Sequence, residues 1–179
     1  MTQVEHRRLC TDRLLIVQIS TADIQALVDG NTEQVEGLLE ASFPQPYMPP
    51  PLMDDALPFI CGWLRDHPND QWWKPWFFAD RERRMIVGAA GFSGPSQSGA
   101  LQLGYAVYSE YKGYGYATEA AQALMQEIWS DASITAVQAT IPPWHSDSIR
   151  VAEKLGMTAV GETNDDEVGK IIVYEIARP

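Results

Sequence analysis

The fold of this chain is decided by the stretch Lys112-Gly113-Tyr114-Gly115-Tyr116-Ala117-Thr118-Glu119-Ala120. The stretch lies between an apolar run typical of a strand and the most periodic helical segment of the sequence. Glycine adopts backbone conformations that other residues avoid, so Gly113 and Gly115 allow a tight turn from strand to helix. The first turn of a helix has unpaired amide N–H groups and the positive end of the helix dipole. The stretch therefore predicts a seat for an anion such as a phosphate or diphosphate, with Lys112 adding positive charge at its edge.

Two nucleotide-binding motifs also place glycines before a helix. A P-loop needs Gly-x-x-x-x-Gly-Lys-Ser/Thr, which the sequence lacks. A dinucleotide fingerprint needs a third small residue where Thr118 stands, and a carboxylate at the end of the next strand, where the sequence has Ile141-Pro142-Pro143. A dinucleotide-binding domain is therefore the less favoured alternative, and a Gly-x-Gly turn without a ligand is another.

The glycine stretch resembles the acetyl-coenzyme A site of the GNAT acetyltransferases, whose pattern is Arg/Gln-x-x-Gly-x-Gly/Ala at the start of a helix. In this sequence Lys112-x-x-Gly115-x-Ala117 lies in that frame. The run Ala117-Thr118-Glu119-Ala120 is similar to the RimJ/RimL branch, which acetylates protein N-termini and other amines. Two further stretches agree in order and spacing. Thr11–Leu15 resembles the first strand of that branch, and Ser148–Met157 resembles its last helix and the turn after it.

The resemblance implies that acetyl-CoA binds with its diphosphate on the main-chain N–H groups of this loop. It also implies that the pantetheine arm pairs like an added strand with the strand before the loop. For that, the strand must splay apart from the next strand of the sheet. The predicted cofactor-binding residues are Val107, Tyr108, Lys112, Gly113, Tyr114, Gly115, Tyr116, Ala117 and Thr118.

The catalytic groups are specified less completely. Many relatives carry Glu in a Glu-x-Gly-Tyr setting, and here Gln102 occupies that slot, with an amide that cannot accept a proton. Either a water chain or another carboxylate then takes the proton of the amine, or the chain only binds or senses acyl-CoA. The predicted catalytic residues are Ser148, to bond or protonate the leaving sulfur, and His145, as an acid or base. A serine that starts a helix and a surface histidine explain the same residues without catalysis.

The resemblance implies an amine acceptor, either a protein or peptide N-terminus or a small amine, and the sequence does not choose between them. Aromatic residues in or beside loops can hold an ammonium by cation–π contact, or can simply cover the core. The acidic run Asp165–Glu167 can attract a basic acceptor, or can be the solvated tip of a hairpin. The aromatic residues are Phe43, Tyr47, Trp72 and Trp73.

Composition agrees with a single domain over residues 1–179. With 45% apolar and 21% charged residues, the sequence is typical of a globular protein. The net charge of −11 argues against a nucleic-acid partner. It is compatible with steering of a cationic acceptor, and also with solubility alone.

Cysteine and histidine usage indicates a reducing compartment and no metal. Cys10 and Cys61 are the two cysteines, and the three histidines have no metal-ligand spacing. The segment Met1–Arg8 is polar, and no stretch reaches the length of a membrane span. We therefore expect a cytoplasmic protein with no membrane partner, present as a monomer or homodimer.

The order of predicted elements indicates an α/β fold with a mixed sheet flanked by helices. Strands at 76–80, 85–93 and 101–108 are expected to run antiparallel into the glycine loop. Residues from Ala117 to Trp129 have the apolar spacing of a helix, and a strand at 135–141 must then pair in parallel with strand 101–108 through a right-handed crossover. This order resembles the GNAT fold, mostly antiparallel with one splayed parallel pair. The remaining elements are a strand within 9–19, helices near 20–29, 33–41, 54–67 and 148–155, and a hairpin of 158–163 with 170–177.

Overall fold

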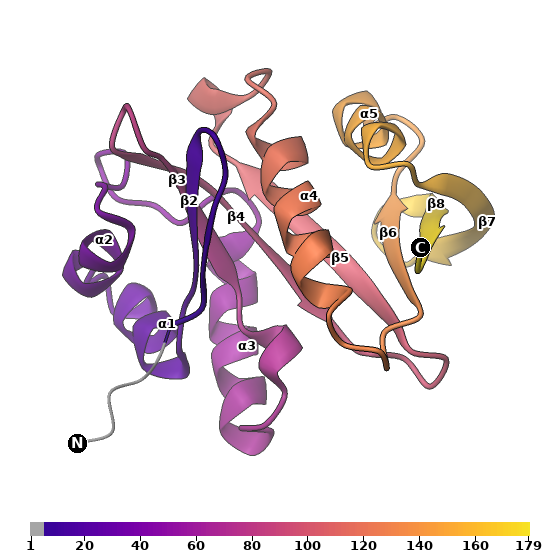
Figure 1. The fold of residues 1–179 in the computed structure, drawn as a ribbon, viewed down its shortest axis with the longest axis horizontal. Helices are drawn as coiled ribbons and strands as arrows, with labels where there is room; N and C mark the ends of the chain where they lie inside the picture. The colour runs from indigo at the N-terminus through magenta and orange to yellow at the C-terminus, as the bar shows by residue number, and fades with distance from the viewer. Residues whose placement is uncertain (1–5) are drawn as a thin grey trace.

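The computed structural model describes residues 6–179, so the first five residues of the polar segment Met1–Arg8 lie outside the described part. The chain forms an eight-stranded sheet with helices on both faces (Figure 1). The strand order is β1-β2-β3-β4-β5-β6-β8-β7, and β5–β6 is the parallel pair among antiparallel neighbours. The strands are β1 (Arg8–Cys10), β2 (Leu14–Gln18), β3 (Trp76–Asp80), β4 (Met85–Ser93), β5 (Ala100–Val107), β6 (Ala136–Ile141), β7 (Thr158–Asp165) and β8 (Gly169–Ala177).

Alternation along the strands divides the core into two layers. Phe77 and Phe78 are adjacent in β3 and fully buried, but they belong to different hydrophobic clusters on opposite faces of the sheet. One face is covered by α1 (Thr21–Val28), α2 (Glu33–Leu39) and α3 (Met53–Asp66). The other is covered by α4 (Tyr116–Ile128) and α5 (Ser146–Lys154). Short 3₁₀ turns complete the elements, η1 (Gln71–Trp73) and η2 (Ser109–Tyr111).

The helix after the glycine loop is confirmed, and its composition explains how closely it packs. Ala120 and Ala121 are fully buried near its start, and Leu124 and Ile128 continue the buried stripe. Small side chains at the first turns allow the helix to lie close to the sheet. The N-terminus of α4 is thereby fixed at the end of β5.

Two differences from the sequence prediction bear on the site. The single strand expected within 9–19 is a hairpin of β1 and β2, because Thr11 closes a turn by bonding the amide of Leu14 through its hydroxyl oxygen at 2.9 Å. The helix expected to begin at Ser148 begins at Ser146, with His145 at its cap position. Ser148 therefore lies inside the first turn of α5.

The parallel pair is short and then opens. β5 and β6 pair over three positions, from Ala100 opposite Ala136 to Gln102 opposite Gln138. Beyond this point β5 continues with β4 as far as Val107, while β6 continues with β8 as far as Ile141. The splay that the resemblance implied is therefore present, and we call this opening the fork.

Within residues 6–179, no helix combines the length and apolar character needed to cross a membrane. The same part of the chain contains no cluster of three His, Cys, Asp or Glu side chains placed to hold a metal ion. Cys10 is exposed and Cys61 is buried, and both are free thiols.

Candidate functional site: an anion seat at the fork

The loop from β5 to α4 turns at two glycines with left-handed backbone. Gly113 has φ of 81° and Gly115 has φ of 82°, a region that residues with a side chain rarely adopt. Gly115 occupies the cap position of α4, and no side chain caps the helix. The amide groups of the first turn are therefore left open by the sequence itself.

The open amides can be followed through the hydrogen bonds of the loop. Within residues 6–179, none of the main-chain N–H groups from Gly113 to Thr118 donates to a protein acceptor. Pairing resumes at Glu119, whose N–H donates to the carbonyl of Gly115 at 3.1 Å. Six consecutive donors at the positive end of a helix fit a diphosphate, and the exposed Lys112 lies beside them.

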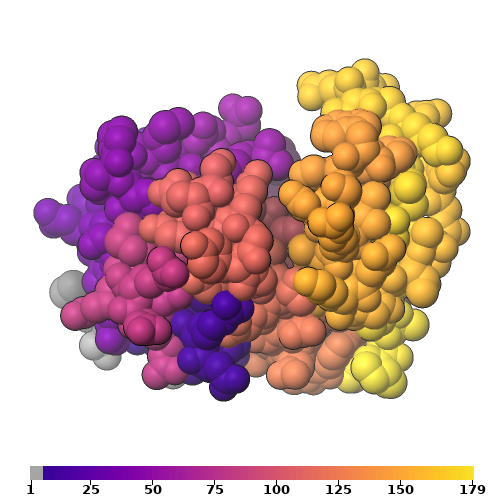
Figure 2. Space-filling view, turned by 90° about the horizontal axis from the view of Figure 1, so that it is seen from above, coloured from indigo at the N-terminus to yellow at the C-terminus, as the bar shows by residue number. Residues whose placement is uncertain are grey.

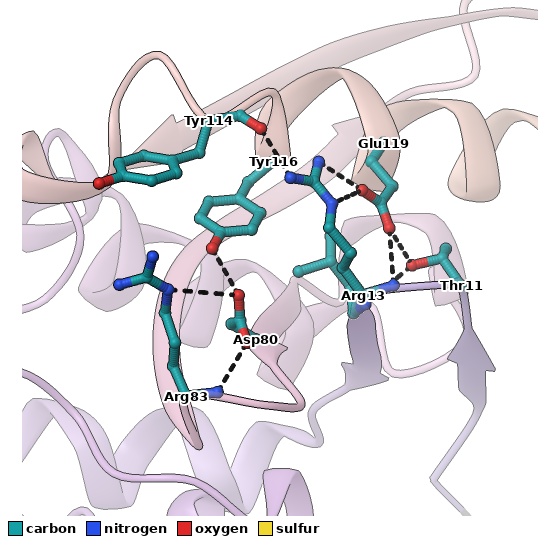
Figure 3. Close-up of polar contacts among 8 residues, drawn as sticks. Thr11, Arg13, Asp80, Arg83, Tyr114, Tyr116 and Glu119 are labelled. Atoms are coloured by element: carbon teal, nitrogen blue, oxygen red, sulfur yellow. Dashed lines mark hydrogen bonds and ion pairs between the residues drawn. The ribbon is translucent and has the colours of Figure 1, made fainter.

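A first set of contacts holds this loop to the β1–β2 turn (Figure 3). The guanidinium of Arg13 donates to the carboxylate of Glu119 at 2.7 Å and 2.6 Å, and to the carbonyl of Tyr114 at 2.8 Å. The hydroxyl of Thr11 donates to the same carboxylate. Arg13 also lies 4.9 Å from the ring centroid of Tyr116. One arginine thus fixes both the loop and the first turn of α4.

A second set of contacts holds the loop to the β3–β4 turn. Tyr116 is only 3% exposed, and its hydroxyl donates to the carboxylate of Asp80 at 2.5 Å. Asp80 also accepts the amides of Glu82 and Arg83 at 2.9 Å and 2.8 Å. The guanidinium of Arg83 lies 5.1 Å from the ring centroid of Tyr114, which stacks on Tyr116 (Figure 3). The side chain of Tyr116 is therefore occupied, and of its groups the main-chain N–H is the one without an acceptor within residues 6–179.

These contacts shift the titration of three groups. Burial opposes ionisation of Asp80, but hydrogen bonds from Arg83, Tyr116 and Glu82 outweigh it and lower the pKa of this carboxyl. Burial likewise opposes ionisation of Glu119, and bonds from Thr11 and Arg13 outweigh it, so the pKa of Glu119 is also lowered. Burial, and then the bond to Asp80, raise the pKa of Tyr116 to about 12. Both carboxylates are charged at neutral pH, and the phenol is neutral.

The main chain of β5 presents one of its two predicted contacts to the fork. The amide of Tyr108 donates to the carbonyl of Val87 on β4 at 3.1 Å, so it is already occupied. Because hydrogen-bonded and non-hydrogen-bonded positions alternate in an antiparallel ladder, the main-chain groups of Val107 turn away from β4. Val107 therefore offers the free backbone group, while the hydroxyl of Tyr108 donates to the carbonyl of Met48 at 2.6 Å.

The two predicted catalytic residues lie together at the start of α5. The hydroxyl of Ser148 lies 2.9 Å from Nδ1 of His145. The hydroxyl of Tyr105, on β5, donates to the main-chain carbonyl of Ser148 at 3.1 Å. This bond crosses the fork and places the Ser148–His145 pair beside it. Seen from above in Figure 2, the surface is hollowed between the salmon part of the chain near residue 115 and the orange part near residue 145.

A cavity of about 390 Å³ lies on the α3 side of the fork. Its floor contains Gly91 and Gly104, which face each other across β4 and β5. Gln102 and Thr140 line it where the two strands separate, and the amide of Gln102 donates to the hydroxyl of Thr140 at 3.1 Å. The cavity reaches the fork from the face of the sheet opposite α4, and we call it the acceptor cavity.

A larger hollow of about 740 Å³ lies at the β1–β2 turn, away from the fork. Its arginines alternate with acidic side chains, and Arg8 and Arg84 contact Glu40. The charges of this larger hollow are balanced among its own side chains, and it does not reach the fork, so we place the chemistry at the smaller cavity.

The structure separates the aromatic residues that the sequence grouped. Phe43 and Trp72 are buried in the core, which agrees with the interpretation that they cover the core rather than hold an ammonium. Trp73 lines the acceptor cavity, and Tyr47 packs against Phe43 with ring centroids 5.0 Å apart. The acidic run is a hairpin tip, where Asp165 accepts the amides of the β7–β8 turn.

A mixed sheet with a splayed parallel pair, and a glycine turn with open amides at the splay, defines the fold of the GNAT acetyltransferases. A family model described as the acetyltransferase (GNAT) domain matches residues 13–158, and the chain belongs to that family.

Individual relatives are more distant. YjdG of Bacillus subtilis (strain 168), named an uncharacterized N-acetyltransferase, is 27% identical over 103 residues, which are 57% of this chain and 61% of YjdG. YkkB of the same organism, an uncharacterized protein, is 33% identical over 85 residues, which are 46% of this chain and 49% of YkkB. The chain thus spans about half to three fifths of the length of these curated relatives. A solved structure of RimL, a ribosomal L7/L12 alpha-N-protein acetyltransferase in complex with coenzyme A, superposes with a TM-score of 0.67 at 14% identity, over 96% of this chain and 98% of that one.

Proposed function

We propose that the protein is an N-acetyltransferase of RimJ/RimL type that transfers the acetyl group of acetyl-CoA to a primary amine by direct attack. The observation that carries this proposal is the set of open amides from Gly113 to Thr118 at the mouth of the fork. The name of YjdG and the coenzyme A complex of RimL support the same chemistry. Assignment to the RimJ/RimL branch is supported by two of the stretches that resemble it, Ala117–Ala120 and Ser148–Met157.

The residues of the loop fit the diphosphate of a coenzyme. The amides of residues 113–118 would bind its oxygens, and because main-chain donors are already fixed, no side-chain rotamer has to be frozen. Lys112 would add charge, and the free backbone of Val107 would pair with the pantetheine arm as an added strand. Arg13 and Asp80 do not face the ligand in this arrangement. They hold the loop in its open form.

Acetyl-CoA supplies the thioester: the amine nitrogen bonds the acetyl carbon, the C–S bond breaks, and the proton lost by nitrogen is balanced by one gained by sulfur. Ser148 would donate that proton, and the position of its hydroxyl beside the fork supports this role. His145 would return a proton to Ser148 through the 2.9 Å contact between Nδ1 and Oγ. The Tyr105 bond to the carbonyl of Ser148 keeps the pair beside β5.

The test combines binding and turnover. A specific coenzyme at 100 times its dissociation constant stabilises the folded state by about 2.7 kcal/mol, which corresponds to roughly 5–10 °C for a chain of this size. We expect acetyl-CoA and CoA to produce this shift, NADH to produce none, and acetyl-CoA with an amine panel to release thiol. A melting temperature that ignores acetyl-CoA would overturn the proposal.

A second candidate function is acyl-CoA binding or sensing without catalysis. The observation that favours it is Gln102, whose amide is bonded to Thr140 in the position where many relatives carry a carboxylate. This function predicts the same thermal shift with acetyl-CoA but no thiol release with any amine. Transfer to a single amine, shown by the mass of the product, would exclude it.

A further inference from the structure

We infer that the acceptor is a weakly basic primary amine joined to an uncharged, apolar group, as in a peptide or amino-acid amide whose first side chain is apolar. The same inference excludes polyamines and lysine side chains as good acceptors. It rests on the proposed function and narrows it, because it concerns the cavity that faces the coenzyme across the fork.

The walls of the acceptor cavity are apolar and its floor is made of small residues. The floor comes from β4 and β5, where Gly91 lies opposite Gly104 and Ala89 lies opposite Ala106. Residues of α3 form the opposite wall, together with the end of η1 and the segment after it. This wall consists of Met53, Ala56, Ile60, Trp73 and Pro75. A flat or branched apolar group fits between such surfaces, and a hydrated chain of charges does not.

The charge pattern of the cavity is the second argument. The described residues that line it include no Asp, Glu, Lys, Arg or His; Tyr105 is the one residue among them with an ionisable side chain, and its hydroxyl is bonded to Ser148 on the α5 side of the sheet. Burial raises the pKa of Tyr105, so its phenol is neutral at physiological pH. Asp54 and Asp55, on the exposed first turn of α3, and His145, on α5, lie outside the lining. An ammonium that entered would lose water without gaining a counter-charge, which is unfavourable.

The polar pair at the fork also favours a neutral amine. Gln102 donates through Nε2 to Thr140, and its carbonyl oxygen receives no donor within residues 6–179. That oxygen can accept an N–H bond from an incoming amine and so orient its lone pair. It cannot remove a proton. The amine must therefore lose its proton in water before it enters, and its own pKa limits the rate.

The size of this limit follows from ordinary pKa values. An α-amine with pKa about 7.8 is roughly one third neutral at pH 7.5, whereas a lysine-type amine with pKa about 10.4 is roughly 0.1% neutral. The neutral fraction alone therefore favours the α-amine by roughly 250-fold. A carboxylate in the cavity could remove the proton of a lysine-type amine and so reduce the preference for the α-amine. Because no carboxylate of the described residues lines the cavity, we expect the preference to remain.

The rim of the cavity continues the apolar surface outward. Leu52 lines the cavity and is 85% exposed, and Phe59, on α3, is 61% exposed and lies with its ring centroid 6.1 Å from that of Trp73. Large apolar side chains left in water at the mouth of a cavity are typical of a binding surface. They extend the preference for apolar groups beyond the amine itself.

The first experiment compares acceptors of matched shape. Phenylalanine amide, a phenylalanyl peptide, phenethylamine and spermidine are assayed with acetyl-CoA by thiol release and product mass. At pH 7.5 we expect kcat/KM for phenylalanine amide to exceed that for phenethylamine by roughly two orders of magnitude, and spermidine to be the poorest. The peptide arm distinguishes a polypeptide acceptor from a small amine. Spermidine or phenethylamine as the best acceptor would overturn the inference.

The pH dependence of kcat/KM separates the basicity of the acceptor from its steric fit in the cavity, because steric fit does not change with pH. With each acceptor, kcat/KM should rise with pH up to the pKa of that acceptor, so the two phenyl compounds should give profiles displaced by about 2.5 pH units. Superimposable profiles would show an enzyme base and contradict the inference. Gln102→Glu should introduce such a base, and raise the activity with phenethylamine more than the activity with phenylalanine amide.

A pair of glycine variants tests the location. A Cβ on Gly104 meets no atom within 4 Å, so Gly104→Val fills the cavity without displacing the protein. We expect KM for phenylalanine amide to rise at least tenfold while the calorimetric affinity for CoA is retained. Gly161→Val is the matched control, since Gly161 lies in β7 with equally open space. Unchanged acceptor KM in Gly104→Val refutes the placement. If the unaltered protein does not bind CoA, the proposed function is refuted instead. If it binds CoA but transfers acetyl to no acceptor, both the proposed function and the inference about the acceptor are overturned.

Discussion

Replacing Thr118 by glutamate separates the stability of the anion seat from its function. Thr118 is the third residue of α4, and its amide is one of the six open donors. A carboxylate in the first turn of a helix interacts favourably with the helix dipole, by about 0.3–1 kcal/mol. Thr118→Glu should therefore fold as well as the original protein, or slightly better. The same carboxylate lies where a diphosphate would bind, so coenzyme affinity should fall.

The size of the loss can be worked from the helix geometry. The first turn rises by about 5 Å, so the new charge lies within about 5 Å of the two diphosphate charges. At that distance the repulsion in water is about 1.7 kcal/mol without salt, and about half of that at physiological ionic strength. The expected increase in Kd for CoA is therefore roughly 5- to 20-fold. Gln126→Glu is the control, because it adds the same charge eight residues farther along α4, about 12 Å from position 118. At that distance the screened repulsion between the carboxylate and the diphosphate is about 0.2 kcal/mol.

Isothermal titration calorimetry at 0.05, 0.15 and 0.5 M salt measures the difference between the two variants. The ratio of their Kd values should be largest at low salt and should approach unity at high salt. Equal Kd values for both variants at low salt, with melting temperatures retained, would refute the placement of the diphosphate. Gly115 is a poorer target, because its φ of 82° is strained for any side chain and a lost affinity would not be separable from a distorted loop.

Three further predictions concern the contacts around the seat and the fork. Tyr116→Phe removes the hydroxyl that is bonded to Asp80, and it should lower the free energy of unfolding by about 1–2 kcal/mol, which is measured as a lower melting temperature. It should also weaken CoA binding. An unchanged melting temperature would show that the bond contributes nothing to stability. Because the pKa values of Asp80 and Glu119 are lowered in the folded protein, their stabilisation is present above the unfolded pKa of about 4 and is lost as pH falls below it. Thermal melting should therefore be flat above about pH 5 and fall in acid, and Asp80→Asn should reduce that fall. Ser148→Ala should lower kcat by about 100-fold with CoA affinity retained, and a retained kcat would leave Ser148 with only its place in the first turn of α5.

The backbone of the anion seat was largely predictable from the sequence because it is local. Two glycines, a basic residue and an amphipathic helix within about twenty positions fix the backbone that exposes the amides. The antiparallel run of β3, β4 and β5 was predictable for the same reason, since each turn joins neighbouring strands. The parallel crossover to β6 followed from the helix between the strands.

The contacts that hold the seat were not predictable, because they join distant parts of the chain. Arg13 and Glu119 are 106 residues apart, and Tyr116 and Asp80 are 36 apart. The sequence predicted a role for the amide of Tyr116, but it gave no sign that the ring is buried and that its hydroxyl donates to Asp80. The hairpin at the start of the chain was missed because the Thr11 hydroxyl closes the turn, with no glycine or proline to signal it.

The acceptor cavity, unlike the anion seat, could not be predicted from any one stretch of sequence. In a strand, Gly104 indicates only weak packing, since glycine there lacks a side chain and costs conformational entropy. In the folded protein Gly104 lies opposite Gly91 on β4, beneath α3 and next to Gln102, and the missing side chains leave the space that the acceptor would occupy. The anion seat is made by one continuous stretch of backbone, while the cavity that we propose for the acceptor is assembled from α3, β4, β5, β6, and η1 with the residues after it. The chemistry of the acceptor therefore has to be inferred from the lining of the cavity, which is mostly apolar and, within the described residues, contains no Asp, Glu, Lys, Arg or His.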